Sequence, residues 1–446
     1  MCPNLGDMFV KNRKKAISVS MFTILVLFIS LPTGCATSFE PRPADQVGFM
    51  ERVQTQIYSK VTVSVAVPSI EESRELFDVK LDKEGVQPIW VRIQNGESIP
   101  IIFMQLHMDS GYYSPAEASY KTRFKSSKKL SLEKDKYFQE KAFPGITIPP
   151  GSDYSGFVFV NLDEGTKGVV VTLMGPKKVK SFVFIVPVPG FRADYLERDI
   201  NNVYPEEEYL DFNDGTSLRV ALEGLPRAVT NEKGTAEGDP LNLVLIGEFE
   251  DMVAAFTIAG WDETHALYVG TALKTTSSFI FRKAYRYSPV SSLYVFGRPQ
   301  DVSFQKSRES IHERNHMRFW KTSYRFKGIS LWIGQISRDI GIKYTLKTGF
   351  LTTHKIDPDV DKDRGYVFQD LIDSQAVNAI GFVKGVEEAP FSEPRYNLGD
   401  DPYFTDGLRG VFYLSDLPVP FGEIKFMQWD FPPIFDEYRD RWFGVK

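Results

Sequence analysis

The sequence predicts two domains of different class: an all-β, immunoglobulin-like sandwich over residues 59–190 and a mixed α+β domain over residues 211–418. Three observations support this. The chain of 446 residues is 42% apolar and 25% charged, enough for more than one hydrophobic core. Its first half carries short alternating runs between Pro and Gly turns, without a convincing helix period. Its second half mixes such runs with helical periods, which is typical of an α+β domain.

The predicted strands of the first domain show the period of two expected for a half-buried sheet. In residues 60–68 a valine occupies every second position, and small or polar residues lie between. Residues 88–95 and 100–108 follow as a predicted hairpin across a Gly-containing turn. Further strands are expected at residues 146–162, 168–175 and 180–188. Short strands separated in this way favour an antiparallel sandwich of two sheets.

The run from Lys125 to Lys136 is the most basic part of this domain. One interpretation is contact with anionic lipid headgroups. The simpler one is a solvated loop or strand edge that lysines keep from aggregating. Acids interrupt the run, so the solvated loop is favoured. His107 lies in an apolar run and is expected to be buried or at a strand edge.

Residues 191–210 are charged and rich in tyrosine, which predicts a linker between the domains. In residues 248–261 one helical stripe is apolar, acids occupy the first turn, and Gly260 is placed to end the helix. A second helix is predicted at about 359–374 and a weaker one within 264–281. Strands are predicted at 216–225, 241–247, 292–298, 301–306, 316–322, 328–337, 349–355, 379–386 and 410–415. The aromatic and Pro-rich tail, 419–446, is expected to pack back on a domain surface.

The amino-terminal segment has the features of a bacterial lipoprotein signal peptide, predicted over residues 1–34 with Met1 or Met8 as the start. A cluster of four basic residues precedes a 16-residue apolar run, which is short for a spanning helix. LPTGC, Leu31–Cys35, resembles a lipobox, although Pro32 stands where the leucine usually lies. Cys35 is therefore the predicted lipidation site, followed by a tether over residues 35–58. If cleavage fails, the run would remain as an anchor.

These features predict a protein held at the outer membrane and facing the periplasm, because no aspartate that would favour inner-membrane retention follows Cys35. Two acyl chains on one cysteine suffice for stable attachment. With Cys2 lost and Cys35 acylated, no thiol remains for a disulfide, a zinc-thiolate site or a nucleophile. Removing residues 1–34 takes the net charge from −5 to −8, so a nucleic-acid partner is not expected.

The densest group of titratable residues lies in residues 314–320, 336–341 and 354–365. His316, Asp339 and His354 could ligate a divalent metal, with Asp357 or Asp359 as the base of a hydrolytic reaction. The same residues could equally form a hydrogen-bonded core network with the arginines, since buried polar clusters are common.

Two other ligands can be considered for this stretch. Arg298, Arg318, Arg338 and Arg364, with the start of the following helix, could clamp a phosphate or carboxylate. Calcium is disfavoured, because Lys362 and Phe368 occupy the loop positions that need glycine and glutamate. Asp357 is instead predicted as a helix N-cap, with Asp359 in the first turn of that helix. His265 and His312 have no supporting neighbours in the sequence and are expected to be exposed.

Several blocks resemble, in order, those of the LssY carboxy-terminal-domain family, over about residues 218–414. They are GDPLNLVLIGEFEDMVAAFTIAGW, SPVSSLYVFGRPQDVSFQK, RNHMRFW, ISRDIGI, THKIDPDVDKDRGY and RYNLGDDPYFTDG. The family often occurs beside phosphatase-type or DedA-type membrane proteins in bacterial envelopes. The resemblance therefore implies a fold and a location, but no chemistry.

Two functions remain open. The first is a lipid-anchored envelope protein that acts as a binding or accessory module for another envelope protein or a small anionic ligand. The alternative is a metal-dependent hydrolase acting on an envelope phosphate or ester substrate. The sequence has no phosphate loop, dinucleotide fingerprint or Gly-x-Ser-x-Gly elbow, so the serine hydrolases are not expected.

Overall fold

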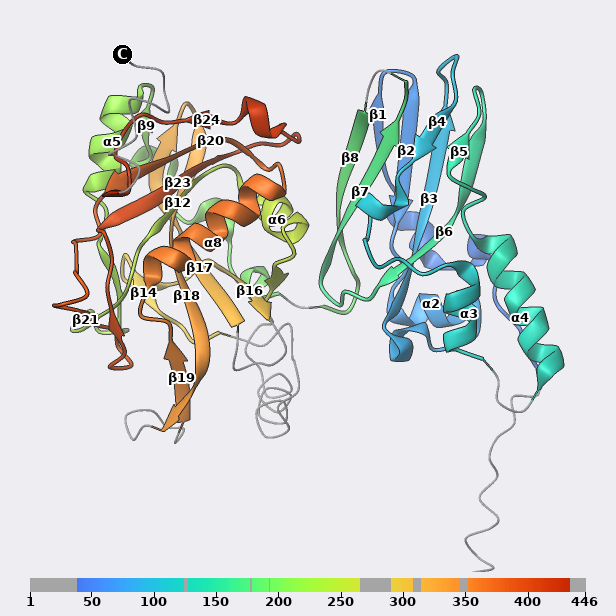
Figure 1. The fold of residues 1–446 in the computed structure, drawn as a ribbon, viewed down its shortest axis with the longest axis horizontal. Coiled ribbons are helices and arrows are strands. Elements are labelled where there is room, and N and C mark those ends of the chain that lie inside the picture. Colours follow the sequence, from blue (N-terminus) through green and yellow to red (C-terminus); the bar gives the residue numbers. More distant parts are fainter. Residues whose placement is uncertain are drawn as a thin grey trace, which may run out of the picture.

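The computed structural model describes residues 38–123, 127–176, 179–191, 193–264, 290–307, 314–344 and 352–433. Two domains lie side by side, with the sandwich at the right in Figure 1 and the larger sheet at the left. The predicted mixed α+β class and the β-sheet core of the first domain are confirmed, but the prediction that the first domain is all-β is wrong, because three helices belong to it. The signal peptide, Cys35, the weaker helix within 264–281, His265 and His312 lie outside the described residues. Among those described, no helix is long and apolar enough to cross a membrane.

The first domain is a sandwich of two four-stranded sheets. One sheet has the order β1-β2-β3-β6 and the other the order β5-β4-β7-β8. The chain passes between the sheets after β3, β5 and β6, as in immunoglobulin-like sandwiches. The predicted period of two places Val63 opposite Ile93 and Val65 opposite Val91 in the core. The strands are β1 (Gln54–Tyr58), β2 (Val61–Ala66), β3 (Val86–Asn95), β4 (Ile101–Phe103), β5 (Thr147–Ile148), β6 (Asp153–Asn161), β7 (Thr166–Met174) and β8 (Val179–Pro187).

Three helices close the lower end of the sandwich: α2 (Ile70–Phe77), α3 (Pro115–Lys121) and α4 (Lys128–Lys141). Phe138 of α4 and Phe159 of β6 pack around Phe77 of α2, and the centroids of the stacked Phe138 and Phe159 rings are 5.3 Å apart. The solvated loop predicted for Lys125 to Lys136 is therefore wrong, because most of that run is in α4. The Ser127 side chain caps the helix, and Lys134 and Phe138, four residues apart, both point inward.

Burial of Lys134 makes the stability of this domain depend on pH. Its Nζ donates to the Ser119 carbonyl at 2.5 Å, and desolvation lowers its pKa from 10.5 to about 8. The unfolded chain therefore holds more protons than the folded one between these pH values, so stability rises as pH rises from about 8 to 10.5. Between these pH values we expect the free energy of unfolding of the wild-type protein, measured with urea, to rise by on the order of 2 kcal/mol, and we expect this rise to be absent in Lys134→Met. Equal slopes in both proteins would contradict this assignment.

The predicted tether is also wrong for most of its length. Phe49 is fully buried in the cluster around Phe77, and β1 adds a strand to the sandwich through five residue pairs with β2. Two 3-10 turns, Ala44–Gln46 and Gly48–Arg52, connect these contacts. The chain therefore joins the folded domain almost from its first described residue.

The second domain is built on a ten-stranded mixed sheet with the main order β13-β16-β17-β18-β12-β23-β20-β24. β19 pairs with β18, and β9 pairs with β17. Most neighbours are antiparallel, whereas β12 runs parallel to β23, β20 to β24 and β9 to β17. The strands are β9 (Leu210–Phe212), β12 (Leu243–Ile246), β13 (Asp262–Glu263), β16 (Val302–Ser307), β17 (Arg314–Phe326), β18 (Ile329–Tyr344), β19 (Thr352–Ile356), β20 (Val377–Lys384), β23 (Leu408–Leu414) and β24 (Lys425–Phe426).

Helices cover both faces of this sheet. The predicted helices appear as α6 (Phe249–Ile258) and α8 (Val360–Asp373), which pack on the face that carries Met317 and Phe319. α5 (Gly215–Glu223) packs on the other face. Short strands complete the domain: β10 (Ala228–Thr230), β11 (Glu237–Pro240), β14 (Tyr294–Val295), β15 (Arg298–Pro299), β21 (Arg395–Tyr396) and β22 (Pro402–Tyr403).

The strand predicted at 216–225 is a helix. The alternation of Leu218, Val220 and Leu222 resembles a strand, but Leu218 and Leu222 are buried one helical turn apart and Val220 is 65% exposed. The Asp214 side chain accepts hydrogen bonds from the amides of Thr216 and Ser217, so it starts the helix.

Residues 191–210 pack on the second domain instead of crossing free space as a linker. Ile200 enters its core, and the Tyr204 hydroxyl accepts a hydrogen bond from Arg298 at 2.8 Å. The tail also returns: β24 pairs with β20, and Asp430 accepts a bidentate hydrogen-bond pair from Arg219.

Candidate functional site

The predicted polar residues lie on one face of the central sheet. His316 of β17 is opposite Gln305 of β16 and Ser337 of β18, and Arg318 is opposite Gln335. Directly paired residues project from the same face of an antiparallel sheet. Met317 and Phe319 project from the other face into the core under α6.

His316 and Asp339 are joined in a buried network. His316 Nε2 lies 3.0 Å from Asp339 Oδ1, and Arg314 Nε donates to Asp339 Oδ2 at 3.2 Å. A guanidinium nitrogen of Arg318 lies 3.1 Å from His316 Nδ1 and also donates to Gln335. His316 is 8% exposed and Asp339 1% exposed. The sequence prediction that these groups meet is correct for His316, Asp339 and Arg318.

The partners of His316 decide its protonation. Arginine can only donate, so Nδ1 accepts from Arg318 and Nε2–H donates to Asp339. Burial lowers the pKa of His316, which favours this neutral tautomer. Both ring nitrogens are then engaged within the protein, and neither has a free lone pair for a metal or a substrate proton. The donor set therefore fits a structural network and does not fit the predicted metal site.

Further carboxylates surround this network. Asn397 donates to Asp239 Oδ1 at 2.8 Å; burial raises the pKa of Asp239, while this hydrogen bond and the charge of Arg318 oppose that rise. Asp194 accepts from Thr264 Oγ1 at 2.7 Å, and burial raises its pKa to about 6. Acids therefore balance the buried arginine charges from inside the protein.

Only the backbone of His354 is described, and its side chain is not. It is paired with Ile342 across β18 and β19, three positions along β18 from Asp339. Within the described ranges, no group of three His, Cys, Asp or Glu side chains could hold a metal ion.

The predicted arginine clamp is not assembled, since three of its four members pair with separate carboxylates. Arg298 binds Asp301 at 2.9 Å, Arg338 lies 3.2 Å from Asp363, and Arg364 binds Asp406 at 2.7 Å. Arg318 belongs to the His316 network instead.

The two predicted catalytic aspartates have structural roles. Asp359, and not Asp357, is the N-cap of α8, where its side chain accepts from the Lys362 amide at 3.3 Å. Asp357 accepts from the Asp359 amide at 3.0 Å. The cap lies two residues later than predicted, because the chain from β19 continues through a bridge between Asp359 and Phe404 before it turns into the helix.

The comparison with known families covers the elements just described. Residues 222–408 match the family model described as LssY C-terminus. This part of the chain belongs to the LssY C-terminus family. The LssY C-terminus domain so defined begins at the end of α5, ends at the start of β23, and contains the whole His316 network. The sandwich lies outside the match, and no match was found among curated proteins.

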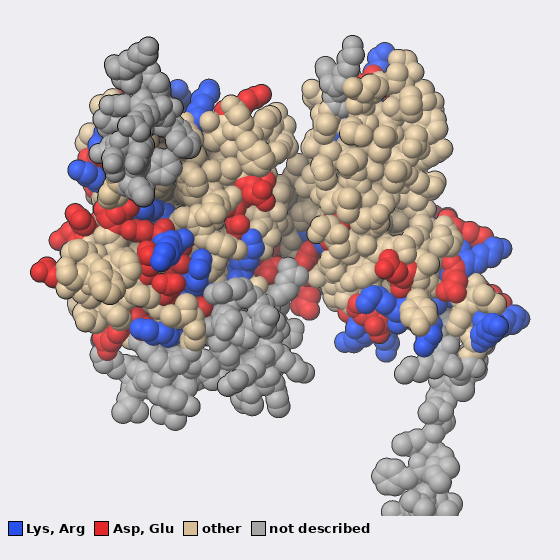
Figure 2. Space-filling model, in the orientation of Figure 1, with Lys and Arg blue, Asp and Glu red and all other residues tan. Residues whose placement is uncertain are grey.

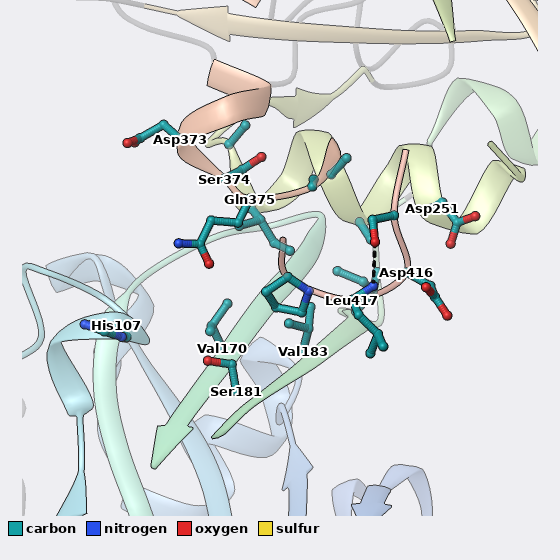
Figure 3. Close-up of a pocket in the computed structure, with 18 of the residues that line it drawn as sticks. His107, Val170, Ser181, Val183, Asp251, Asp373, Ser374, Gln375, Asp416 and Leu417 are labelled. Carbon is teal, nitrogen blue, oxygen red and sulfur yellow. Dashed lines mark hydrogen bonds between the residues drawn. The ribbon is translucent and has the colours of Figure 1, made fainter. Parts of the chain in front are cut away.

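A cleft of about 770 Å³ lies between the sandwich and the second domain. The domains meet below it, where Glu263 accepts from the Thr166 amide and hydroxyl, both at 2.9 Å. Gly168 also approaches α6 closely: a Cβ there would lie 3.1 Å from Thr257 Cγ2. Figure 3 shows Val170, Ser181 and Val183 on one side of the cleft, facing Gln375 and Leu417 on the other.

The two walls of the cleft differ in chemistry. The sandwich wall comes from β7, β8 and His107, and it carries no Asp, Glu, Lys or Arg among the residues described. His107 is exposed in the 3-10 turn Gln105–His107, so the expectation that it is buried or at a strand edge is wrong. This lobe has a large uncharged surface in Figure 2. The opposite wall comes from α6, Lys306 of β16, the end of α8 and the turn after β23. Its charged residues are Glu250, Asp251, Lys306, Asp370, Asp373 and Asp416.

Most of these acids are not neutralised. Asp370 binds Lys306 at 2.8 Å, whereas Glu250, Asp373 and Asp416 have no ion-pair partner within the described ranges. Burial, together with the charges of Asp416 and the nearby glutamates, raises the pKa of Asp251. Sequence reasoning missed this site because its residues range from His107 to Pro418. The only local signal, acids in the first turn of α6, has a sufficient explanation in the helix dipole.

Proposed function

We propose that the protein is a lipid-anchored binding module of the bacterial cell envelope and that its ligand occupies the interdomain cleft. The observation that carries this proposal is the pairing of an uncharged sheet wall with an acidic helical wall around 770 Å³. Clefts between domains are frequent ligand sites. The lipobox-like Leu31–Cys35 segment supports attachment through Cys35 to the outer membrane, facing the periplasm.

The chemistry of the walls favours a ligand that is both cationic and apolar. Uncompensated carboxylates disfavour the small anionic ligand considered from the sequence, because like charges repel. Valine and isoleucine side chains of β7 and β8 offer apolar contact on the other side. A basic, amphipathic segment of an envelope protein combines the two properties.

We expect Asp373→Asn with Asp416→Asn to weaken binding of a labelled peptide of alternating Lys and Leu by roughly tenfold. The reason is that the attraction between two exposed carboxylates and the lysines of the peptide is lost. Fluorescence anisotropy on the full chain measures this. The matched control is Glu232→Gln with Glu393→Gln, which removes two exposed acids that do not line the cleft. Equal affinities of both double variants for the peptide would contradict the proposed site. Equal binding of a Glu and Leu peptide would contradict its charge preference.

A further inference from the structure

The amino-terminal end of the described chain is held on the helices at the lower end of the sandwich. The Phe39 ring lies 5.6 Å from the Tyr137 ring of α4. The Glu40 amide donates to Asp78 at 2.8 Å, and the Arg42 amide donates to the Glu75 carbonyl of α2 at 2.8 Å. From Phe39 onward the chain therefore follows the surface of the domain.

This leaves very little chain between the domain and the proposed anchor. Cys35 is three residues before Ser38, the first described residue. Three residues span at most about 10 Å even when fully extended. An acylated Cys35 sulfur lies at the bilayer surface, so Phe39 and the flank of α4 that it contacts must lie close to the headgroups.

The charge of this region suits an anionic membrane. Without the buried Lys134, residues 121–141 hold seven Lys or Arg and three Asp or Glu, a net charge of +4 in a chain of −5. Lys128, Lys129 and Lys136 are exposed on α4, and Leu132 between them is 59% exposed. Figure 2 shows basic side chains along this lower edge of the sandwich lobe.

The three acids of this region offset only part of its positive charge. Glu133 lies 3.8 Å from Lys129, and Glu140 lies 3.5 Å from Lys136. Asp135 accepts a hydrogen bond from Ser119 of α3. On α3 and after it, Lys121 and Arg123 are exposed and lie over the rings of Tyr113 and Tyr120.

We infer that the exposed surface of α3 and α4 rests on anionic phospholipid headgroups next to the acylated Cys35. This inference rests on the proposed lipid anchor, and it adds an orientation to it. Each lysine near an anionic membrane surface increases the membrane affinity roughly fivefold. Leu132 and Tyr120, which is 62% exposed, supply apolar contact at the interface.

The test uses the acylated full-length product, which has no other thiol once the leader is removed. A fluorophore is attached at Leu132→Cys and, as the control, at Val220→Cys on α5, which is similarly exposed at 65%. On phosphatidylglycerol-containing vesicles we expect acrylamide quenching to fall about threefold at position 132 and to stay unchanged at position 220. Equal quenching at both positions on the vesicles would overturn the inference.

Charge reversal separates this surface from the anchor. Lys128→Glu with Lys129→Glu and Lys136→Glu should abolish the protection at position 132 while the protein stays on the vesicles. Lys233→Glu with Lys384→Glu and Lys425→Glu, all exposed in the other domain, changes the net charge equally and should leave the protection intact. Retained protection in the first variant overturns the inference. Loss of vesicle attachment, with no fatty acid on Cys35 by mass spectrometry, overturns the lipid anchor itself.

Discussion

Asp339→Ala is expected to destabilise the LssY C-terminus domain by about 3–5 kcal/mol, because it leaves buried charged and polar groups without their acceptor. Asp339 is 1% exposed and binds Arg314 and His316 together. Chemical unfolding followed by tryptophan fluorescence measures the change, since Trp320 and Trp332 lie in this sheet.

The matched control for this prediction is Asp373→Ala, which removes an exposed carboxylate of the same domain and should have little effect on unfolding. Similar unfolding curves for the two variants would contradict a structural role for the network. The metal content of the wild-type protein is a second readout. A stoichiometric metal that disappears in Asp339→Ala would restore the hydrolase hypothesis.

Arg409→Met is expected to cost at least about 4 kcal/mol, because five carbonyl oxygens lose their donor in the protein interior. Arg409 is fully buried and donates to the carbonyls of Leu241, Leu222, Leu225, Pro226 and Gly385. Burial lowers its pKa to about 10, so it remains charged at neutral pH. It connects the end of α5 to β23 and to the turn after β20.

Arg409→Lys tests the geometry of this contact. Lysine keeps the charge, but its single ammonium cannot reach all five carbonyls, so we expect a loss of stability of roughly half the size. Arg42→Met, at an exposed ion pair in the other domain, is the matched control and should change little. The assignment fails if Arg409→Met unfolds at the same denaturant concentration as the wild type.

Local patterns predicted elements well where one period dominated. The valines at every second position of β2 and the apolar stripe of α6 each repeat over enough residues to distinguish strand from helix. Predictions of short elements failed, because three or four apolar residues fit both the strand period and the helix period. Leu218, Val220 and Leu222 are an example: only Asp214 at the cap and the exposure of Val220 reveal the helix.

The polar cluster was predictable in membership but not in chemistry. Alternation placed His316 and Arg318 on one face, and Asp339 proved to be their neighbour. Which nitrogen of His316 accepts and which donates depends on partners from β17 and β18 together. The pairing of Arg298, Arg338 and Arg364 with separate acids likewise needs contacts between distant segments.

The sequence by itself determined the sandwich of the first domain, and the class, the family and the two main helices of the second, because these depend on periods and blocks of neighbouring residues. Only the tertiary structure decided that the His316 network is saturated with internal hydrogen bonds and that a cleft with unlike walls lies between the domains. It also showed that the chain is bound to α4 four residues after Cys35, at Phe39. These features depend on where distant residues meet, and a local sequence pattern carries no such distances.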